Sequence, residues 1–229
     1  MENSIVFKVI LLGDHTVGKT CFINRYCKDT YNENQISTVG IINYKKILTI
    51  NKKKINLTIY DTSGQERYRS LAKNFYKGAD GILLFYDITS KESFQSIGNW
   101  IESINENIEK SEIGLLIIGN KNDLEHSREV SEEMKKELEK SQNVEIIETS
   151  AKNNINIDIS FNKLIQKMLR LKELNENPDK KDIIKLGENI IEEKSKESGG
   201  CCFKKNKKKK MKDLNKKIKR RINYYILFL

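Results

Sequence analysis

The chain has 229 residues, of which 38% are hydrophobic, and a net charge of +10. This length fits one compact domain with an appendage better than two domains. Residues 201–229 hold 12 of the 42 basic residues and one acid, whereas residues 1–200 hold 30 basic and 31 acidic residues. A body so close to neutral disfavours a dedicated nucleic-acid-binding domain, and the charge of the tail indicates an anionic partner instead.

Three other classes of protein are disfavoured by the residue pattern. Cys21 and Cys27 lack the spacing of a zinc site or a disulfide framework, so we expect buried, reduced thiols. The first residues, MENSIVFKVILLG, lack the basic stretch and cleavage site of a signal peptide. No segment approaches the roughly 20 apolar residues that cross a membrane. These observations favour a cytoplasmic protein.

Apolar runs and turn residues divide residues 5–174 into strands and helices. The predicted strands cover 5–12, 41–50, 55–60, 81–86, 113–118 and 144–147. The predicted helices cover 19–26, 93–104, a segment that begins at Ser131, and 155–174. Strands 41–50 and 55–60 are joined by a polar turn, which predicts a hairpin, and elsewhere strands alternate with helices. The sequence therefore predicts an α/β fold with a doubly wound, mostly parallel six-stranded sheet and one antiparallel edge strand. A ligand is expected at the carboxyl ends of the strands.

Between the first predicted strand and the first helix lies Gly13-Asp-His-Thr-Val-Gly-Lys-Thr20, which fits the phosphate-loop pattern G-x-x-x-x-G-K-[ST]. Glycines let backbone N–H groups curve around phosphate oxygens, and the helix N-terminus adds a favourable dipole. Lys19 would neutralise β- and γ-phosphate charge, and the hydroxyl of Thr20 would bind Mg²⁺. The expected phosphate-binding residues are Gly13, His15, Thr16, Val17, Gly18, Lys19, Thr20 and Cys21.

Two later segments carry the prediction of guanine specificity. In Asn120-Lys-Asn-Asp123, the carboxylate of Asp123 can accept hydrogen bonds from N1–H and the exocyclic amine of guanine, a donor pair that adenine lacks. The second segment, Ser150-Ala-Lys152, could line the guanine edge. By itself, the first segment could be an ordinary surface loop, and the second carries almost no information. Their positions after the fifth and sixth predicted strands favour a base-binding site. The expected base-binding residues are Asn120, Lys121, Asp123, Ser150, Ala151 and Lys152.

Asp61-Thr-Ser-Gly-Gln65 follows the third predicted strand. An acid at Asp61 can hold Mg²⁺ through water, the N–H of Gly64 can sense the γ-phosphate, and Gln65 can orient an attacking water. Standing alone, the segment would be an ordinary D-x-x-G turn. Its place after a buried strand favours a role in phosphoryl transfer.

Together the four motifs resemble those of the Ras superfamily of P-loop GTPases, over roughly residues 5–174. Four segments are similar to Rab proteins in particular: Arg67–Ser70, Phe75–Ala79, Leu84–Thr89 and Cys201–Cys202. The resemblance implies a GTP-binding domain over residues 1–174 and a hypervariable, disordered basic tail over residues 175–229. It also implies a Mg²⁺-dependent GTP/GDP switch in vesicle or membrane trafficking, with slow hydrolysis that depends on Gln65 and Lys19.

The resemblance assigns further roles by position. Thr38 would bind Mg²⁺ in the GTP state, so the expected metal ligands are Thr20, Thr38 and Asp61. Tyr31 would flank the base, and Tyr60 and Tyr76 would belong to an aromatic effector surface. Exchange factors, GTPase-activating proteins and effectors are expected at switch regions near residues 31–44 and 61–79. The protein would then work on the cytosolic face of an intracellular membrane.

The chain departs from the family pattern at several positions. His15 and Thr16 replace small residues of the phosphate loop, Ser63 replaces an alanine, and Thr38–Tyr44 has one residue more than T-I-G-x-D-F. Two interpretations of His15 are open. If its ring crowds the γ-phosphate and an incoming arginine finger, His15→Ser speeds hydrolysis; if the ring points outward, the two forms hydrolyse GTP equally fast.

Three rival functions remain beside the leading hypothesis. A pseudo-switch would hold GTP without hydrolysing it, which His15 favours and Gln65 opposes. A P-loop kinase would prefer adenine, which Asp123 opposes. A nucleic-acid-binding protein would use the basic tail alone, without a recognition surface on the body.

The tail offers a separate set of alternatives. Cys201 and Cys202 resemble the prenylated pair of Rab proteins, yet 27 residues follow them. Trimming of the chain, an error in the gene model and a tail that replaces the lipid are all open explanations, as is a solvated appendage without function. In the third, the cations between residues 204 and 221 attract anionic lipids, and the apolar end at 222–229 inserts at the interface.

Overall fold

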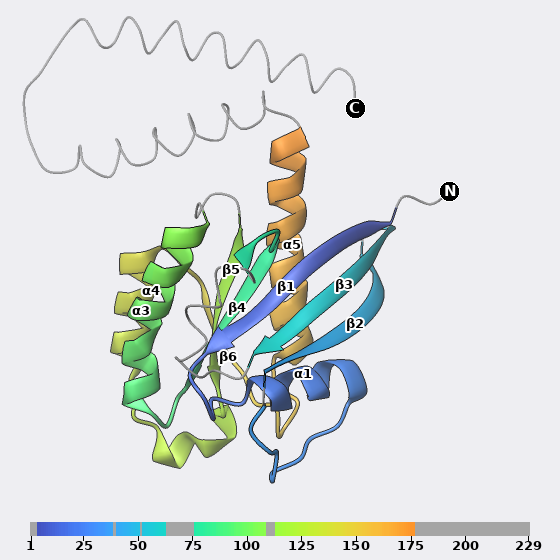
Figure 1. Cartoon of the computed structure of the whole chain (residues 1–229). Helices are drawn as coiled ribbons and strands as arrows, with labels where there is room; N and C mark the ends of the chain where they lie inside the picture. Colours follow the sequence, from blue (N-terminus) through green and yellow to red (C-terminus); the bar gives the residue numbers. More distant parts are fainter. Residues whose placement is uncertain (1–3, 39, 51, 63–75, 109–112, 177–229) are drawn as a thin grey trace, which may run out of the picture. The chain divides into compact units, whose positions relative to one another are not determined.

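The structure is a computed structural model that describes residues 4–38, 40–50, 52–62, 76–108 and 113–176 (Figure 1). The strands are β1 (Ile5–Gly13), β2 (Ile41–Ile50), β3 (Lys53–Thr62), β4 (Gly81–Asp87), β5 (Gly114–Asn120) and β6 (Ile146–Glu148). The helices are α1 (Lys19–Lys28), α3 (Lys91–Asn107), the 3₁₀ helix η3 (Asn122–Ser127), α4 (Glu132–Gln142) and α5 (Ile157–Glu176). Every described residue belongs to one compact unit, Met1–Asn177.

The six strands form one sheet in the order β2-β3-β1-β4-β5-β6. β3, β1, β4, β5 and β6 run parallel to their neighbours, and β2 pairs with β3 antiparallel at the edge. The predicted doubly wound sheet with one antiparallel edge strand is confirmed. Because the parallel strands all end at the same edge, the segments that follow β1, β3, β5 and β6 are brought together there.

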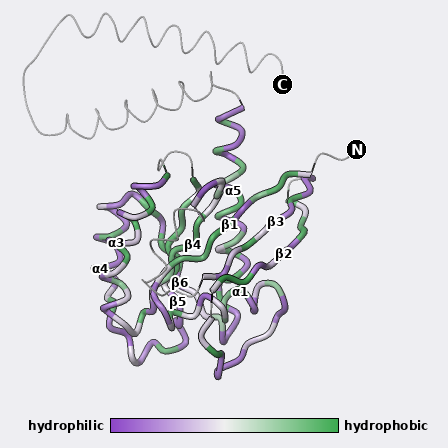
Figure 2. The backbone as a smooth tube through the Cα atoms, in the orientation of Figure 1, coloured by the Kyte–Doolittle hydropathy of each residue, from purple (hydrophilic) through white to green (hydrophobic). Residues whose placement is uncertain are grey.

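The sheet is buried between two hydrophobic cores. On β1, Phe7, Val9 and Leu11 belong to the core shared with α1 and α5, whereas Ile10 and Leu12 belong to the core shared with α3. Figure 2 shows the hydrophobic colour running along β1 and β4. Burial on both faces explains why these strands are continuous apolar runs, and each fully buried aliphatic or aromatic side chain contributes roughly 1.5–3 kcal/mol.

Side-chain caps fix where the helices of the second core begin. The hydroxyl of Ser131 accepts a hydrogen bond from the N–H of Met134 at the start of α4, so the predicted helix start is confirmed. Ser90 caps α3 in the same way through the N–H of Ser93. Such caps satisfy N–H groups that have no partner inside the helix.

Several predicted boundaries and burials were wrong in detail. β3 begins at Lys53 rather than at residue 55, so the hairpin turn is shorter than predicted, and Lys52 adopts φ 62° within it. β5 begins one residue later than predicted, and β6 two residues later. Cys21 and Cys27 carry free thiols but are half-buried, not buried, because both lie on the margin of the α1–α5 core.

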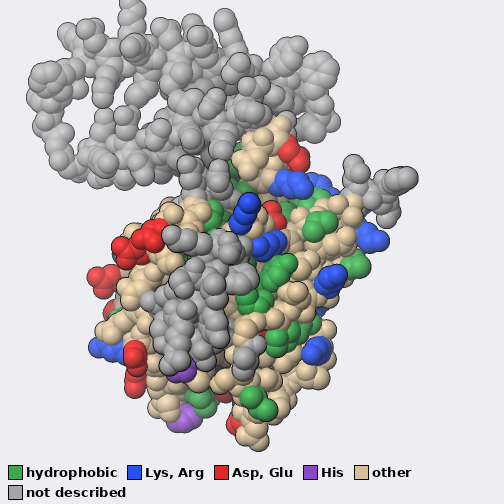
Figure 3. Space-filling view, in the orientation of Figure 1, with side chains coloured by type: hydrophobic (Ala, Val, Ile, Leu, Met, Phe, Trp, Pro, Cys, Tyr) green, Lys and Arg blue, Asp and Glu red, His purple; other side chains and the backbone are tan. Residues whose placement is uncertain are grey.

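The half of the sheet formed by β1, β3 and β2 leaves apolar side chains in contact with solvent on one face. Figure 3 shows hydrophobic side chains gathered over these strands. Val6 and Ile47 stand opposite Asn56 on its two sides and are 61% and 65% exposed. Among the described residues, no helix is long and apolar enough to cross a bilayer.

Candidate nucleotide-binding site

The loop between β1 and α1 adopts backbone conformations that glycine permits. Gly13 has φ 129°, and a Cβ atom there would lie 2.3 Å from the carbonyl oxygen of Phe85. Gly18 has φ 89°, and its Cβ would lie 2.4 Å from the amide nitrogen of Asn120. Thr16 also has a positive φ, 63°, which is strained for a β-branched residue. The two glycines thus let the loop pack closely against β4 and β5.

Lys19 lies under this loop with its side chain almost fully enclosed. The residue is 5% exposed, and its ammonium donates to the carbonyl oxygens of Gly13 at 2.8 Å and Asp14 at 2.7 Å. Burial lowers the pKa of Lys19 to about 8, against the opposing effect of Asp61 and Asp14. An anionic phosphate beside the ammonium would supply the charge that this environment lacks.

Three oxygen-bearing side chains converge next to Lys19. The hydroxyl of Thr20 donates to Oδ2 of Asp61 at 2.6 Å and lies 2.7 Å from the hydroxyl of Thr38. Burial raises the pKa of Asp61, and the hydrogen bond from Thr20 opposes this shift. Asp61 Oδ1 is buried, and no described residue donates a hydrogen bond to it. Such an oxygen set suits Mg²⁺, a hard cation that takes one or two protein oxygens with phosphates and water.

The described residues contain no group of three or more His, Cys, Asp and Glu side chains that could hold a metal ion by themselves. Two hydroxyls and one carboxylate do not fill an octahedral shell, so a cation at Thr20, Thr38 and Asp61 needs oxygens from another source. Phosphate held by the neighbouring loop would provide such oxygens. A metal site at these three residues would therefore form one structural unit with a phosphate site at the loop.

The segment after β5 is tied to its neighbours by a buried network. Asn120 is 1% exposed; its amide nitrogen donates to the carbonyl oxygen of Val17 at 2.9 Å, and its amide oxygen accepts from Thr149 at 3.1 Å. Beyond it, Asp123 Oδ1 accepts from the hydroxyl of Ser150 at 2.5 Å. These bonds join the loops after β1, β5 and β6, so the predicted base-binding segments have a fixed position relative to the phosphate loop.

Charged side chains hold the outer part of these loops. The ammonium of Lys121 lies 2.6 Å from Asp87 at the end of β4. Arg25 of α1 donates to the carbonyl oxygen of Ala151 at 3.0 Å and of Lys152 at 3.3 Å. Lys152 also forms an exposed ion pair with Glu33 at 3.2 Å. The loop after β6 is thus fixed from α1 and from the segment that follows it.

A cavity of about 370 Å³ opens between the phosphate loop and residues 31–38. Among the predicted site residues, it is lined by His15, Thr16, Gly18, Lys19, Thr20, Cys21, Tyr31, Thr38 and Lys121. His15 is exposed, but neither of its two interpretations is tested by this. Leu124 of η3 also lines the cavity, which is large enough for a ligand that spans from the phosphate loop to the base segments.

Some of the predicted residues lie outside the described residues, and others lie away from the cavity. Gly64, Gln65, Cys201 and Cys202 lie outside the described residues. Tyr76 is described, but its place on an aromatic effector surface was wrong, because it is 2% exposed and belongs to the core shared with α3. Its hydroxyl lies 3.4 Å from that of Ser103 on α3. Tyr60 is partly exposed on β3.

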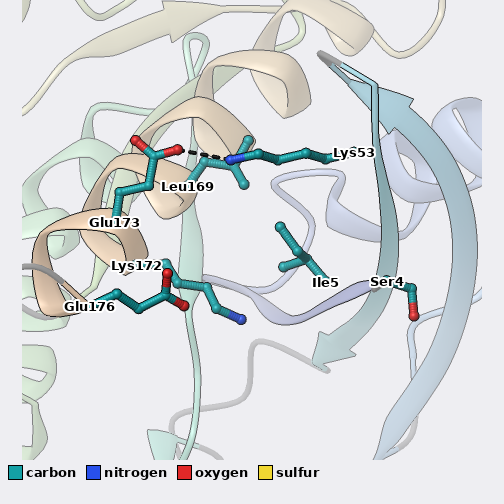
Figure 4. A pocket seen from close by; sticks show the side chains of 7 residues that line it. All are labelled: Ser4, Ile5, Lys53, Leu169, Lys172, Glu173 and Glu176. Carbon is teal, nitrogen blue, oxygen red and sulfur yellow. Dashed lines mark hydrogen bonds and ion pairs between the residues drawn. The ribbon is translucent and has the colours of Figure 1, made fainter. Parts of the chain in front are cut away.

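Another hollow, of about 430 Å³, lies at the amino ends of the parallel strands. Figure 4 shows Lys53 reaching towards Glu173 of α5, with which it forms a 2.9 Å ion pair, while Ile5 and Leu169 line the space between. It holds no phosphate-binding loop and no buried lysine. The chemistry of the molecule is concentrated at the opposite edge of the sheet.

Sequence reasoning missed three residues that position the site: Arg25, Asp87 and Thr149. Thr149 was within reach of prediction, because it immediately precedes Ser150-Ala-Lys152 at the end of β6. Arg25 and Asp87 gave no comparable signal. Their contacts with Lys152 and Lys121 join parts of the chain 127 and 34 positions apart.

The comparisons with known proteins agree with this geometry. The chain matches the Ras family model over residues 8–170. Ras-related protein Rab-13 of Bos taurus is 41% identical over 179 residues, which are 76% of this chain and 88% of that protein. Ras-related protein Rab-8 of Diplobatis ommata is 40% identical over 79% of this chain and 87% of that protein. Ras-related protein Rab-10 of Caenorhabditis elegans is 36% identical over 86% of this chain and 96% of that protein.

The chain is a Rab-family small GTPase. Members of the Ras family bind GTP and hydrolyse it to GDP, and Rab proteins act in membrane traffic. This Rab GTPase therefore has the resemblance, the fold and the activity that its motifs predicted. The leading hypothesis, a Rab-like GTPase that hydrolyses GTP to GDP, is confirmed. Ras-like GTPases are in general Mg²⁺-dependent, in line with the convergence of Thr20, Thr38 and Asp61.

Proposed function

We propose that this Rab GTPase binds guanine nucleotides with the phosphates in the cavity between the phosphate loop and residues 31–38, the base towards the loops after β5 and β6, and Mg²⁺ at Thr20, Thr38 and Asp61. The observation that carries the proposal is the buried Asn120, which hydrogen-bonds to both Val17 and Thr149. This link sets the distance from the phosphate-binding loop to the base-binding carboxylate of Asp123. A single ligand with a phosphate at one end and a guanine at the other fits such a fixed frame.

At the phosphate end, Lys19 and the N-terminus of α1 face the β- and γ-phosphates. Lys19 now donates to two carbonyl oxygens of the loop, so the side chain is held under the loop before a ligand arrives. Phosphate oxygens would accept from the same ammonium and from loop N–H groups. When bound, Mg²⁺ neutralises charge that develops on the transferred phosphoryl group.

At the base end, we assign guanine recognition to Asp123. Oδ1 accepts from Ser150, which orients the carboxylate and leaves the other oxygen free of that contact. The N–H of Asn153 donates to the same Ser150 hydroxyl, so the loop after β6 supports the arrangement. Tyr31 and Leu124 line the cavity and would cover the faces of the base, with Lys121 beside them.

The switch action is assigned to Thr38 and to Gly64 and Gln65. Thr38 reaches the Mg²⁺ site from the segment before β2, so its contact with Thr20 depends on where residues 31–38 lie. Loss of a γ-phosphate would remove one anchor of that segment. Gln65 is the residue to which we assign the orientation of the attacking water. Effectors, exchange factors and GTPase-activating proteins would read these segments, near residues 31–44 and 61–79.

Guanine specificity is tested by replacing the carboxylate that reads the base. We expect Asp123→Asn to lower the affinity for GDP and GTP by roughly 100-fold or more, because an amide cannot accept hydrogen bonds from both guanine donors. The variant should bind xanthine nucleotides in preference. Binding of the guanine, xanthine and adenine nucleotides is measured by competition against a fluorescent GDP. His126→Gln, an exposed exchange in the same 3₁₀ helix, is the control. Equal affinity of the unaltered protein for ATP and GTP would overturn the proposal.

We further propose that the protein works on the cytosolic face of an intracellular membrane and that its basic tail contacts anionic lipid. The relatives are membrane-associated Rab proteins, and the tail carries 12 cations between residues 204 and 221. Each cation near an anionic leaflet contributes about 1 kcal/mol, and the contribution falls with salt. The apolar residues 222–229 follow and would insert at the interface. Lipidation of Cys201 and Cys202 would add to this attraction.

The lipid contact is tested with unlipidated, full-length protein and vesicles that contain phosphatidylserine. We expect cosedimentation at low salt, release at high salt, and no binding for a chain truncated after Ser198. Vesicles of neutral phosphatidylcholine are the control for adsorption without charge. If the intact protein stays in the supernatant with anionic vesicles at low salt, the tail is not an anchor by itself.

A further inference from the structure

The phosphate loop has one side-chain anchor on α3 that the motifs do not predict. The indole N–H of Trp100 donates to Asp14 Oδ1 at 2.8 Å. Trp100 is 4% exposed and packs in the core shared by β1, β4 and α3, whereas Asp14 is the second residue of the phosphate loop. The bond joins residues 86 positions apart, and it is a hydrogen bond to a carboxylate, which is among the stronger kinds.

Asp14 uses two groups at once. Its carboxylate accepts from Trp100, and its backbone carbonyl accepts from the ammonium of Lys19 at 2.7 Å. The side chain that fixes Asp14 therefore also fixes one of the two carbonyl oxygens that place Lys19. A shift of Asp14 would displace the ammonium that faces the phosphates.

The loop needs such an anchor because part of it is strained. Thr16, two residues after Asp14, has φ 63°, a conformation that costs a β-branched residue on the order of 1–3 kcal/mol. Strain of this kind persists only where the surroundings fix the backbone. Val17, on the other side of Thr16, is held by the amide nitrogen of Asn120, which donates to its carbonyl oxygen at 2.9 Å. Trp100 supplies the corresponding restraint on the first half of the loop.

The same helix is also tied to the base-binding end. In the first turn of α3, the Ser93 hydroxyl accepts from the N–H of Asp87 at 3.0 Å, and the Asp87 carboxylate pairs with Lys121 at 2.6 Å. Trp100 lies two turns further along α3. One rigid helix thus reaches both halves of the nucleotide site, which supports a positioning role for α3 over simple packing.

We infer that Trp100 is a positioning residue for nucleotide binding, which acts through Asp14 to hold the phosphate loop and Lys19 in the geometry that retains GDP. The inference rests on the proposed nucleotide site. It goes beyond that site because Trp100 lies outside every motif and does not line the cavity. The alternative is that Trp100 is a core residue whose hydrogen bond to Asp14 has no effect on the ligand.

The test measures the dissociation rate constant of methylanthraniloyl-GDP, with direct excitation of the label, in the presence of Mg²⁺. We expect Trp100→Phe and Asp14→Ala each to raise this rate constant roughly 10- to 150-fold, the range expected when a hydrogen bond to a charged group is lost. Asp14→Asn keeps an acceptor oxygen and should stay within about threefold of the unaltered protein. Ile104→Val shrinks the same core on α3 without a polar contact and should change the rate less than twofold.

A double-mutant cycle separates the hydrogen bond from packing. In the Asp14→Ala background, Trp100→Phe should add less than a twofold effect. An equal effect in both backgrounds, or no effect of either single change, would overturn the inference. Thermal unfolding by circular dichroism accompanies each variant, and Asp14→Ala alone carries the test if Trp100→Phe does not fold, because Asp14 lies at the surface margin.

Trp100 is also the only tryptophan of the chain, so its fluorescence gives a second readout. We expect its emission to change when EDTA removes GDP from the unaltered protein, and this response to be lost in Asp14→Ala. An intact response in Asp14→Ala would contradict the role of the bond. If the unaltered protein does not bind methylanthraniloyl-GDP at all, the proposed nucleotide site fails; if it binds and the variants release GDP at the same rate, only the role of Trp100 fails.

Discussion

The phosphate end and the base end of the candidate site differ in how well the protein itself satisfies their buried polar groups. At the phosphate end, Lys19 is a buried ammonium whose pKa is lowered to about 8 by burial, and Asp61 has a buried oxygen with no donor among the described residues. At the base end, both polar atoms of the buried Asn120 side chain have partners in the protein. The phosphate end therefore has a buried oxygen that lacks a hydrogen-bond donor in the described part of the chain, whereas the buried amide at the base end has its hydrogen bonds satisfied by the protein.

The difference shows how binding energy and structural stability are divided in this Rab GTPase. Lys19 and Asp61 are buried charges that have hydrogen bonds but no opposite charge in direct contact, and Asp61 Oδ1 has no donor among the described residues. This arrangement disfavours the empty protein, so a ligand that supplies phosphate and Mg²⁺ gains further interactions here. A satisfied buried network stabilises the fold and holds the base loop in one position before binding. The two ends should therefore respond to mutation in opposite ways.

The largest effect is expected from Lys19→Met. This change removes the buried ammonium, so we expect nucleotide affinity to fall by roughly 10³-fold, while the free energy of unfolding of the nucleotide-free protein changes by less than about 1 kcal/mol. Fluorescent-GDP titration and urea unfolding of the nucleotide-free form measure the two quantities. Lys28→Met, on the exposed end of the same helix, is the control. A loss of more than about 3 kcal/mol in the empty protein would break the comparison.

A smaller but opposite pattern is expected from Asn120→Ala. The carbonyl of Val17 and the hydroxyl of Thr149 lose their buried partner, so the free energy of unfolding of the nucleotide-free protein should fall by about 2–3 kcal/mol. The affinities for GDP and GTP should fall by the same factor, because the change breaks the link between the loops after β1, β5 and β6 and leaves the side chain of Asp123 unaltered. Urea unfolding is the measurement, and Asn105→Ala on the exposed face of α3 is the control. An unchanged unfolding curve would show that the base end is not self-sufficient.

The smallest effect concerns the one exception at the base end. The hydroxyl of Tyr86 is buried against Gly119, where a Cβ atom added to the glycine would lie 2.5 Å from the hydroxyl oxygen. No described residue forms a hydrogen bond with this hydroxyl. We expect Tyr86→Phe to raise the free energy of unfolding by up to about 1 kcal/mol, because an unsatisfied group is removed. Tyr44→Phe is the matched comparison and should lower it by about 1 kcal/mol, since the Tyr44 hydroxyl lies 3.0 Å from Asn24 Oδ1. A loss of stability in Tyr86→Phe would point to a partner for this hydroxyl outside the described residues.

The fold could be predicted because each strand carries a local signal. Continuous apolar runs such as residues 5–12 and 81–86 occur where a strand is covered on both faces, and the polar turn near residue 52 marks the hairpin. The phosphate-loop and base-loop segments could be placed together for the same reason, since parallel strands bring their carboxyl ends to one edge. Their chemical roles follow from the motifs and stay proposals.

What could not be predicted depends on which side chains meet across the core. Tyr76 was assigned to a surface from family resemblance, yet it packs under α3, and no pattern in its neighbours distinguishes the two positions. Trp100 reads as one more apolar residue on the stripe of a helix, and only the crossing of α3 over β1 brings its indole to Asp14. Arg25 and its carbonyl acceptors are likewise separated by most of the chain.

The outermost strand has a consequence for how copies of this protein behave in concentrated solution. β2 is ten residues long and, within the described part of the chain, pairs with a neighbouring strand on one side only. Its other edge therefore has backbone donors and acceptors with no strand partner among the described residues, and the strand also bears the exposed Ile47. Such edges promote strand-to-strand aggregation unless charge opposes it. Lys45 is exposed within β2, and Lys52 and Lys54 of the adjoining hairpin add two more exposed lysines. Two copies meeting edge to edge would bring these cations together, and because salt shortens the range of that repulsion to about 3 Å at 1 M, self-association through β2 should increase at high ionic strength.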